Sequence, residues 1–573
     1  MKKEVLLIFK THLDIGFTGY ARDIIRRYID EFIPNAIRVG YELKDTDTPF
    51  IWTVGSWLLW KALNEDHSGK VEKAIRDGIL NWHALPFTTH TELMSPRLFE
   101  FGVSLSKKLD KRFGRETVGA KMTDVPGHTK GMIPILKRNG VRFLHLGVNP
   151  ATPVPPVPPL FRWKCGKDEI LVMYEKAYGE VADFDNFTVY FAHTGDNLGP
   201  QCADDIRKVY REAREKYPDA VIKAASIDDI ARRMETLEGL PVFEGEIGDT
   251  WIHGAATDPE KLSRYRRVLR HIESRCILPD ALADHLLLVP EHTWGMDVKK
   301  FFPDTEHFTH HEMERVKAER HTIEESWREQ RAFVERAERF LGLEAEYPVQ
   351  EPSLDGFEKI DLPDTLPYEV SFELFDRSDY ERYEKTYVRC KEPWATWDFT
   401  KVGLPEYKGG IFTARVSEAY EKDGTLLYRL DFDRAAREAY GLPYFWLKKE
   451  GEALTLSWFG KKPSRLPQAF WFKIDGLTQN LRLHKMGEWL RPDSVIGSPL
   501  ISAIDEGIRA DGVKVKSLDA ALVAPYGRRL LRYGEKAGEC DPYFLLYDNI
   551  WNTNFPMWYE GDALFRFEII KEK

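Results

Sequence analysis

The first 250 or so residues alternate strand-like apolar runs with amphipathic helical segments, and this alternation constrains the fold most. The apolar runs are Val5–Phe9, Phe50–Val54, Leu80–Ala84, Val118–Thr123, Phe143–Leu146, Ile170–Tyr174, Val189–Ala192 and Val221–Ala225. Helical patterns occupy Arg22–Glu42, Lys70–Arg76, Leu98–Phe113, Met132–Arg138 and Ala203–Lys216. Such alternation is typical of a parallel sheet with helices outside. Seven or eight units predict an α/β fold of the β/α barrel type. A dinucleotide-binding fold is disfavoured because no G-x-G-x-x-G follows the first strand.

The pattern changes twice after the predicted barrel. From about residue 258, apolar residues such as Leu262, Tyr265, Leu269 and Ile272 recur at helical spacing, which predicts a helical bundle. Beyond an acidic, proline-containing linker, short strands separated by turn residues predict an antiparallel β domain, most simply a sandwich. The sequence therefore predicts three domains: a catalytic barrel over 1–257, a bundle over 258–345 and a β-sandwich over 346–573.

Composition excludes several classes of partner. The net charge is −10 with acids and bases interspersed, which argues against a nucleic-acid-binding surface. The five cysteines are widely spaced, and no C-x-x-C suggests a thiolate metal site or a disulfide framework. We find no apolar stretch of transmembrane length, and the first apolar run is too short for a signal peptide. We expect a cytoplasmic protein with no membrane or nucleic-acid partner.

Carboxylates and imidazoles recur just after the predicted strands. In a parallel barrel the carboxyl ends of the strands carry the active site. His12 and Asp14 follow the first strand and project to the same side of an extended backbone, and an imidazole with a carboxylate is a reasonable start for a zinc site. The other such residues are His90, Glu92, Asp124, His128, His193, Asp196, Glu246, Asp249 and His253. Any one of them could be a solvated loop residue or a helix cap, but their repeated placement favours a functional site.

The order of these motifs resembles the retaining α-mannosidases of glycoside hydrolase family 38, in a divergent branch of that superfamily. The family has an H-x-D-x-G-W motif, and here residues 12–17 read HLDIGF. It has a D-x-F-G-H-S motif followed by a proline, and here residues 124–129 read DVPGHT before Pro134. It has a glycine-rich loop with an acid, matched by residues 193–200, an aromatic segment matched by 245–256, and a histidine-bearing turn matched by 291–293. The match spans roughly residues 4 to 300.

The resemblance implies a zinc-dependent retaining exo-glycosidase. It implies one Zn²⁺ per chain, held by His12, Asp14, Asp124 and His292, with Asp124 also the nucleophile that forms a covalent glycosyl-enzyme. Asp249 is the first choice for the acid/base, with Glu246 and Glu92 in reserve. The remaining residues expected to bind the carbohydrate substrate are Glu92, His128, Asp196, Trp251 and His253. Members of the superfamily often form homo-oligomers, so self-association is also an expectation.

The sequence departs from the family pattern at several positions. Phe17 stands where a tryptophan is usual, Val125 and Pro126 replace the usual residues, and Glu291 and Thr293 flank His292 in place of His and Asp. The sugar-binding pocket can therefore differ from that of the family, and a sugar other than mannose is possible. Two alternatives remain: a zinc-dependent carbohydrate deacetylase or lyase on the same barrel, or a non-catalytic carbohydrate-binding relative.

Overall fold

The computed structural model of the protein describes residues 2–497, 500–535, 538 and 540–572. The chain divides into two compact units. The first unit comprises Met1–Thr91, Pro96–Glu246 and Pro290–His292, and the second comprises Glu92–Ser95, Ile247–Val289 and Thr293–Lys573. The predicted division into three domains at residues 257 and 345 stays a prediction.

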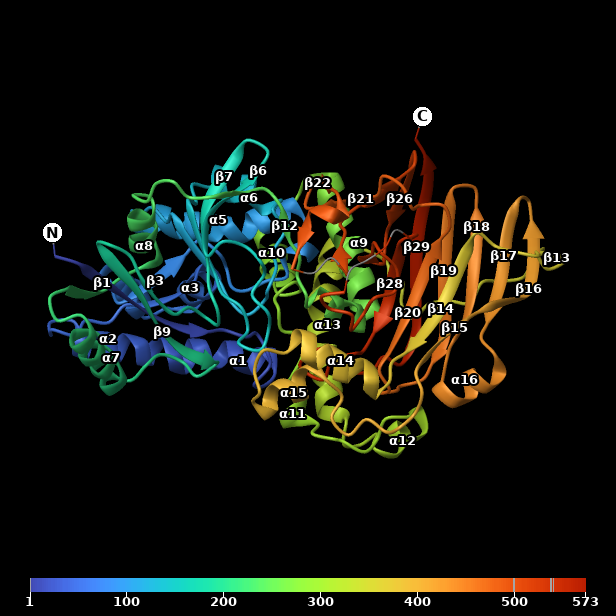
Figure 1. The fold of residues 1–573 in the computed structure, drawn as a ribbon, viewed down its shortest axis with the longest axis horizontal. Helices are drawn as coiled ribbons and strands as arrows, with labels where there is room; N and C mark the ends of the chain where they lie inside the picture. Colours follow the sequence, from blue (N-terminus) through green and yellow to red (C-terminus); the bar gives the residue numbers. More distant parts are fainter. Residues whose placement is uncertain (1, 498–499, 536–537, 539, 573) are drawn as a thin grey trace. The chain divides into compact units, whose positions relative to one another are not determined.

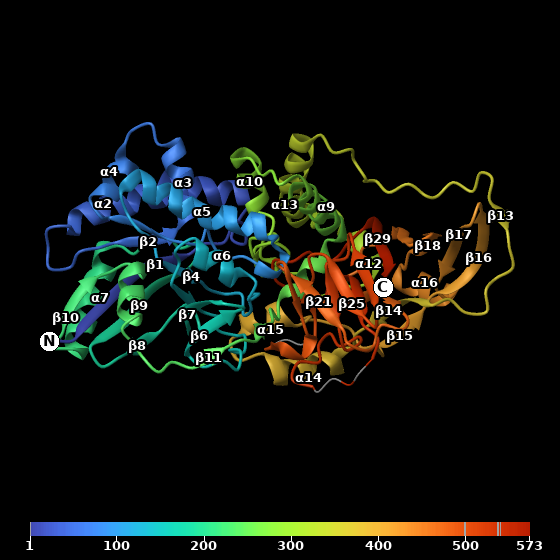
Figure 2. The ribbon, with the colours of Figure 1, turned by 90° about the horizontal axis from the view of Figure 1, so that it is seen from above.

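Strand β1 (Glu4–His12) is the centre of the first unit. It pairs in parallel with β9 (Phe187–Asp196), β2 (Trp52–Gly55) and β10 (Val221–Ala224). The sheet continues through β3 (Leu80–His83) and β8 (Val181–Asp183). The side chains of residues 5–9 are fully buried, as expected for a parallel strand covered on both faces. Figure 2 shows helices on one side of β1 and β2.

A second sheet completes the first unit. Its strands, in spatial order, are β11 (Val242–Phe243), β6 (Leu160–Cys165), β7 (Asp168–Tyr174), β5 (Phe143–Leu146) and β4 (Gly119–Met122). The closed barrel that the sequence predicts is not confirmed, because no sheet closes on itself within the described residues. The physical reason is visible in the pairings: β6 forms an antiparallel hairpin with β7, and β8 forms one with β9. Neither short antiparallel strand was predicted, so the true pattern is not a strict strand–helix alternation.

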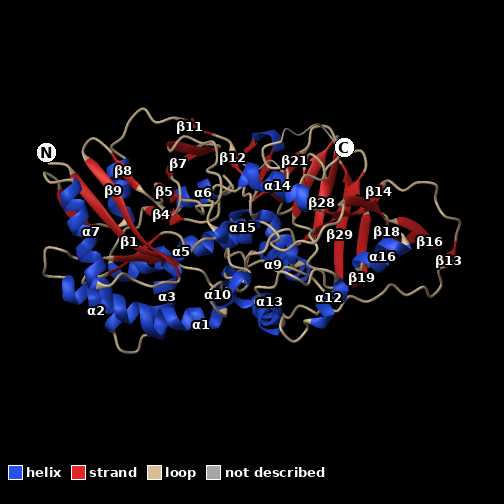
Figure 3. Cartoon of the chain, turned by 60° about the horizontal axis from the view of Figure 1, so that its bottom comes forward, coloured by secondary structure: helices blue, strands red, loops and turns tan. Residues whose placement is uncertain are grey.

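Helices cover these sheets, including two, at residues 56–65 and 227–234, that the sequence patterns did not predict. They are α1 (Ala21–Arg27), α2 (Ile33–Leu43), α3 (Ser56–Glu65), α4 (Lys70–Arg76), α5 (Pro96–Phe113), α6 (Met132–Arg138), α7 (Ala203–Lys216) and α8 (Ile227–Met234). The predicted single helix over 22–42 is instead α1 and α2 joined by a π-helical turn at Tyr28–Phe32. Figure 3 shows α1, α2 and α3 together on one side of the strands of this unit. Apolar side chains of α8, including Ile227 and Ile230, pack into a buried cluster with Leu6 and Ile8 of β1.

The second unit begins with helices, where the sequence predicts a bundle. They are α9 (Pro259–Arg275), α10 (Asp280–Leu287), α11 (Val298–Phe301), α12 (His310–Arg315) and α13 (His321–Leu341), followed by α14 (Arg377–Tyr387), α15 (Pro393–Phe399) and α16 (Arg434–Tyr440). Helix α13 lies against both α9 and α10. Among the described residues, no helix combines the length and apolar character needed to cross a bilayer.

Two antiparallel sheets form the rest of the second unit. The larger sheet has β13 (Glu358–Lys359), β16 (Arg415–Lys422), β17 (Thr425–Asp431), β18 (Tyr444–Glu450), β19 (Ala453–Lys461), β29 (Gly561–Lys571), β26 (Val513–Ser517), β25 (Gly507–Ala510), β21 (Arg482–Lys485) and β22 (Glu488–Leu490). The smaller has β15 (Gly410–Thr413), β14 (Tyr368–Leu374), β20 (Gln468–Ile474), β28 (Tyr543–Asp548), β27 (Leu522–Ala524) and β24 (Ser502–Ala503). Figure 1 shows β29, β19, β18, β17 and β16 side by side.

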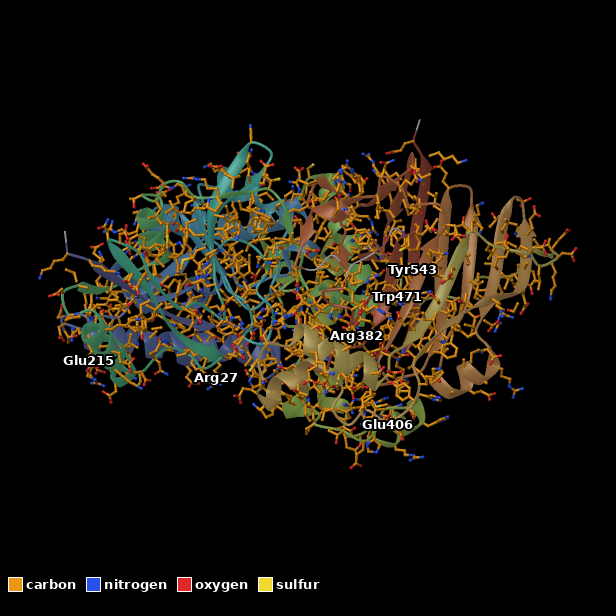
Figure 4. All side chains as sticks on the ribbon, in the orientation of Figure 1. Arg27, Glu215, Arg382, Glu406, Trp471 and Tyr543 are labelled. Atoms are coloured by element: carbon orange, nitrogen blue, oxygen red, sulfur yellow. The ribbon has the colours of Figure 1, made fainter. Side chains whose placement is uncertain are left out.

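Aromatic side chains join the two antiparallel sheets. Trp458 on β19 contacts Phe470 on β20 with ring centroids 5.4 Å apart, and Phe567 on β29 contacts Phe472 at 5.1 Å. Figure 4 labels Trp471, on the same strand as Phe470 and Phe472. Alternate residues of β20 thus face the larger sheet, as in a sandwich.

Candidate metal centre and active site

The four residues expected to bind a metal converge in the first unit. His12 ends β1, Asp14 lies two residues later, Asp124 follows β4, and His292 belongs to the short segment Pro290–His292. The His292 Nε2 atom lies 3.2 Å from His12 Nε2, 2.9 Å from Asp14 Oδ1 and 3.5 Å from Asp124 Oδ2. His12 Nε2 lies 3.3 Å from Asp14 Oδ1. All four side chains are at least nine-tenths buried.

Backbone pairing holds the Pro290–His292 segment against the loop that follows β3. Thr89 and Glu291 form an isolated antiparallel bridge, and the His90 amide donates to the Pro290 carbonyl at 2.8 Å. These bonds place the His292 side chain next to the end of β1, which is 280 residues away in sequence.

A second layer of oxygen atoms orients both imidazoles. Glu291 Oε1 lies 2.7 Å from His292 Nδ1, and Thr123 Oγ1 lies 3.1 Å from His12 Nδ1. In each ring, Nδ1 therefore contacts the orienting oxygen atom, and Nε2 points toward the carboxylates. Metal-binding histidines are usually held in this way.

This donor set fits a divalent cation such as Zn²⁺. Two imidazole nitrogens and carboxylate oxygens are the ligands that zinc prefers in non-thiolate sites. The His12, Asp124 and His292 ligand atoms lie within 4.8 Å of one another, as do those of His12, Asp14 and Asp196. Asp14 Oδ2 is buried and has no hydrogen-bond partner among the described residues, so it is available to a cation. Buried acids and bases this close together would otherwise carry a large desolvation cost.

Charges within the cluster shift the pKa values of its side chains. Burial opposes protonation of His12 and His292, but the adjacent carboxylates outweigh it and raise the pKa of each histidine, that of His292 well above its usual value. Although burial acts in the opposite direction, His12 and His292 hold the pKa of Asp14 below its usual value. The cluster thus contains concentrated negative charge that attracts cations, whether protons or a metal ion.

Asp124 adopts an unusual backbone conformation. Its φ angle is 82°, a region that residues with a Cβ rarely occupy. The Asn149 amide donates to the Asp124 carbonyl at 2.9 Å, and Asn149 Nδ2 donates to Asp124 Oδ1 at 3.1 Å. These bonds help to hold the carboxylate in the cluster. Strain of this kind persists where the surroundings over-determine it, often at functional sites.

Tyr178 connects Asp124 to Asp196. Its hydroxyl oxygen lies 2.9 Å from Asp124 Oδ1 and 3.0 Å from Asp196 Oδ1, and its ring stacks on His12 with centroids 4.4 Å apart. One hydroxyl carries one proton, so it cannot donate to two ionised carboxylates at once. Burial and the Asp14 charge raise the pKa of Asp196 to about 6. A protonated Asp196 that donates to Tyr178, which in turn donates to Asp124, satisfies both contacts.

Sequence motifs did not identify Tyr178, Asn149 or Asn197 as site residues. Asn197 has φ 53°; its Nδ2 donates to the Asp14 carbonyl and its Oδ1 accepts from the Asp14 amide, both at 3.1 Å. Asn197 directly follows β9 and Asn149 lies three residues after β5, so their positions near strand ends could have suggested them. Tyr178 lies in a connection without any motif, and no sequence signal pointed to it.

Two other predicted site residues, His128 and Glu246, are buried in the first unit. His128 is fully buried, and its Nδ1 lies 3.4 Å from Thr91 Oγ1. Glu246 Oε2 accepts from the Lys130 amide at 2.8 Å. The predicted roles of His128 as a substrate ligand and of Glu246 as a reserve acid stay predictions.

The remaining predicted residues belong to the second unit. Glu92 Oε1 accepts from the Asp249 amide at 3.1 Å, and Glu92 Oε2 lies 2.8 Å from Lys485 Nζ in a fully buried ion pair. Trp251 donates its indole N–H to the Tyr387 hydroxyl at 3.0 Å, while His253 Nδ1 lies 3.2 Å from Asp548 Oδ1. Glu92 and Asp249 are thus neighbours, and Lys485 gives Glu92 a structural role. The expected catalytic role of Asp249 and substrate roles of Glu92, Trp251 and His253 stay predictions.

Comparison with known proteins supports the fold. A family model described as "Domain of unknown function (DUF5054)" matches residues 255–351. No curated protein matches the sequence. Among solved structures, an alpha-mannosidase from Enterococcus faecalis is similar over 100% of this chain and 87% of its own, with TM-score 0.58 and 11% identity. A glycosyl hydrolase family 38 protein from Enterococcus faecalis covers 100% and 86%, with TM-score 0.56 and 10% identity. This chain therefore shares the multidomain fold of these two proteins.

Proposed function

We propose that the protein is a metal-dependent retaining glycosidase that acts on a carbohydrate substrate and uses Zn²⁺. The observation that carries this proposal is the convergence of His12, Asp14, Asp124 and His292 in the first unit, with Asp196 beside them. The likeness in fold to an alpha-mannosidase and to a glycosyl hydrolase family 38 protein gives independent support. An exo-acting α-mannosidase is the first specificity to test.

We infer that Asp124 is the nucleophile and that His12, Asp14, Asp124 and His292 hold the metal. A bound Zn²⁺ would supply a Lewis-acid site for sugar hydroxyl groups. The Asp124 carboxylate attacks the anomeric carbon, the bond from that carbon to the leaving oxygen breaks, and a covalent glycosyl ester forms. Water then attacks the same carbon and releases Asp124.

Asp196 replaces Asp249 as our preferred acid/base. Retaining enzymes place their two carboxyl groups about 5–5.5 Å apart. The Oδ1 atoms of Asp124 and Asp196 lie 2.9 Å and 3.0 Å from the Tyr178 hydroxyl oxygen, so the two atoms are at most 5.9 Å apart, which is compatible with that spacing. In the first step the Asp196 proton passes to the leaving oxygen. In the second step Asp196 takes a proton from the attacking water, which restores the starting state.

The test is a panel of aryl glycosides, with metal content measured on the same preparation. We expect one Zn²⁺ per chain and turnover of at least one aryl α-glycoside with retention of configuration. Asp124→Ala should abolish turnover while the protein stays folded, whereas Asp185→Ala, at an exposed turn in the same unit, should behave as wild type. Full activity in Asp124→Ala would overturn the proposal. Release of acetate from acetylated sugars without glycosidic cleavage would favour a deacetylase, and binding without turnover would favour a non-catalytic relative.

A further inference from the structure

A buried chain of charged and polar side chains lies in the first unit, outside the metal cluster. Lys121 on β4 donates from Nζ to His145 Nδ1 at 2.8 Å, and His145 Nε2 lies 2.7 Å from Glu175 Oε2. Lys121 and His145 are paired residues of neighbouring strands, and both are almost completely buried. A neutral imidazole that accepts at Nδ1 and donates at Nε2 satisfies both contacts. Burial raises the pKa of Glu175 to about 7.

Burying a lysine in this position lowers the stability of the fold, so its presence calls for an explanation. The interior of a parallel β/α unit is normally filled by branched apolar side chains. Burying an ammonium group costs free energy that its contacts only partly return. The Lys121 amine also lies 4.1 Å from the centre of the Phe191 ring, and it donates a second hydrogen bond, at 2.7 Å, to the carbonyl of Tyr178. This last bond leads directly to the candidate active site.

Residues 175–179, which we call the Tyr178 strap, are anchored at several points. The Glu175 amide donates to the Leu146 carbonyl at 2.9 Å, and the Ala177 carbonyl accepts from the Val148 amide at 2.9 Å. Gly147 is required beneath Ala177, because a Cβ there would lie 2.2 Å from the Ala177 carbonyl oxygen.

The end of the strap is equally constrained. Gly179 has φ 122°, and a Cβ on it would lie 2.5 Å from Phe191 Cδ2. The Lys121 amine holds the intervening Tyr178 carbonyl. With its backbone fixed on both sides, Tyr178 presents its hydroxyl to Asp124 and Asp196 and its ring to His12.

We propose that Lys121 is a positioning residue: through the Tyr178 carbonyl it fixes the Tyr178 hydroxyl between Asp124 and Asp196. The inference rests on the proposed function, because it assigns a consequence for glycoside cleavage. Lys121 does not touch the reacting atoms. Its effect on catalysis passes through Tyr178, whose hydroxyl contacts both the Asp124 and the Asp196 carboxyl groups.

A double-mutant cycle tests this route. Lys121→Met fills the same volume without the two hydrogen bonds, and Tyr178→Phe keeps the ring without the hydroxyl. We expect Lys121→Met to lower kcat about tenfold or more with KM within about threefold, but to lower kcat less than about threefold further in the Tyr178→Phe background. An equal factor in both backgrounds would mean that Lys121 acts elsewhere and would overturn the proposal.

Two further variants separate positioning from general stability. Lys107 also donates its amine to a backbone carbonyl, that of Thr117, just before β4, so Lys107→Met is the matched control and should leave kcat unchanged. Lys121→Gln retains an N–H donor and should recover part of the loss. If Lys121→Met does not fold, Gly179→Ala displaces the strap from its other end, and its effect on kcat should likewise shrink in the Tyr178→Phe background. An undiminished effect there counts against the proposal.

Hydrogen–deuterium exchange separates this inference from the proposed function. The amides of residues 175–180 should exchange about tenfold faster or more in Lys121→Met than in the wild type, and at the wild-type rate in Lys107→Met. Lack of glycosidase activity in the wild type would defeat the proposed function but leave this readout intact. Unchanged exchange in Lys121→Met would defeat the anchoring role whatever the enzyme's activity.

Discussion

His12 Nε2 and His292 Nε2 lie 3.2 Å apart, although 280 residues separate them in the chain. His12 is the last residue of β1, the central strand of the first unit. His292 belongs to the segment Pro290–His292, which is part of the first unit although the residues before and after it in sequence belong to the second. Thr123 Oγ1 contacts Nδ1 of His12 and Glu291 Oε1 contacts Nδ1 of His292, so both Nε2 atoms are oriented toward the neighbouring carboxylates. This arrangement is suited to a cation and sets the first prediction.

Glu291→Gln should weaken metal binding without destroying the site. The Glu291 carboxylate lies 2.7 Å from His292 Nδ1, where it orients the ring and makes Nε2 a stronger donor. Removing such a partner typically costs 10- to 100-fold in metal affinity, so we expect about a tenfold or greater rise in the dissociation constant for Zn²⁺. Competition with a chromophoric chelator measures it.

His292→Ala shows the Zn²⁺ affinity of a site that lacks one ligand, and it should abolish stoichiometric Zn²⁺ binding. Glu244→Gln, at an exposed position of the first unit, is the control and should bind Zn²⁺ as the wild type does. Equal affinity in Glu291→Gln and wild type would show that the His292 ring is held by its backbone segment alone.

The identity of the acid/base can be read from leaving-group dependence. An enzyme without its acid still cleaves substrates whose leaving group needs no protonation. In Asp196→Ala, kcat/KM, which reports the first step, should therefore change little on a dinitrophenyl glycoside but fall about a hundredfold or more on a methylumbelliferyl or alkyl glycoside.

Asp249→Ala is the matched comparison, because Asp249 was the choice from sequence. Its carboxylate accepts from the Trp251 amide at 2.8 Å, so its loss should disturb the local turn and affect all substrates alike. The reverse result, with a selective loss in Asp249→Ala and a uniform one in Asp196→Ala, would restore the original assignment.

Much of the candidate site was predictable because its ligands follow strand ends. His12 and Asp14 come directly after a buried apolar run, and Asp124 follows another, so the period-2 pattern and the carboxyl-end rule located them. His292 has no such local signal. It was predicted only through the resemblance to a family, since its place depends on backbone pairing with a loop 200 residues earlier.

The sheets were predicted less well, and the reason is local. Strand β6 alternates half-exposed and buried residues, and the three residues of β8 are half-exposed or exposed. No apolar run therefore marked either strand in the sequence. Their antiparallel pairing breaks the parallel alternation on which the closed barrel was predicted. Tyr178 was missed for a related reason: its position comes from tertiary anchors on Lys121 and Phe191, which lie on other strands.

Backbone strain at Asp124 predicts an unusual ranking of variants. Asp124 has φ 82°, which costs about 1–2 kcal/mol for a residue with a Cβ and nothing for glycine. Asp124→Gly and Asp124→Ala both remove the carboxylate, but only Gly also removes the Cβ. The free energy of unfolding, measured in urea, should be higher for Asp124→Gly by about 1 kcal/mol, after the greater unfolded-state entropy of glycine is allowed for. A more stable Asp124→Ala would show that the site relaxes to an ordinary φ once the carboxylate is gone.

A buried glutamate in the second unit predicts a pH dependence of stability. Glu373 on β14 is 7% exposed, and the Trp471 indole N–H donates to its Oε2 at 2.9 Å. Burial raises the pKa of Glu373 from 4.5 to about 7. Between those values the native state holds a proton that the unfolded state has lost. The contribution of Glu373 to the free energy of unfolding should therefore fall with rising pH across this window, by about 1.4 kcal/mol per pH unit, and level off above about pH 7.

Glu373→Gln isolates this contribution. Glutamine keeps an oxygen for the Trp471 N–H but cannot ionise, so the unfolding free energy of the variant should fall less steeply than that of the wild type between pH 4.5 and 7 and exceed it at pH 8. Urea unfolding at pH 5 and pH 8 measures both quantities. Glu358→Gln, at an exposed position on β13, is the control and should keep the wild-type slope. If wild type and Glu373→Gln fall in parallel, Glu373 is ionised in the native protein, and the nearby Arg528 guanidinium has offset the cost of burial.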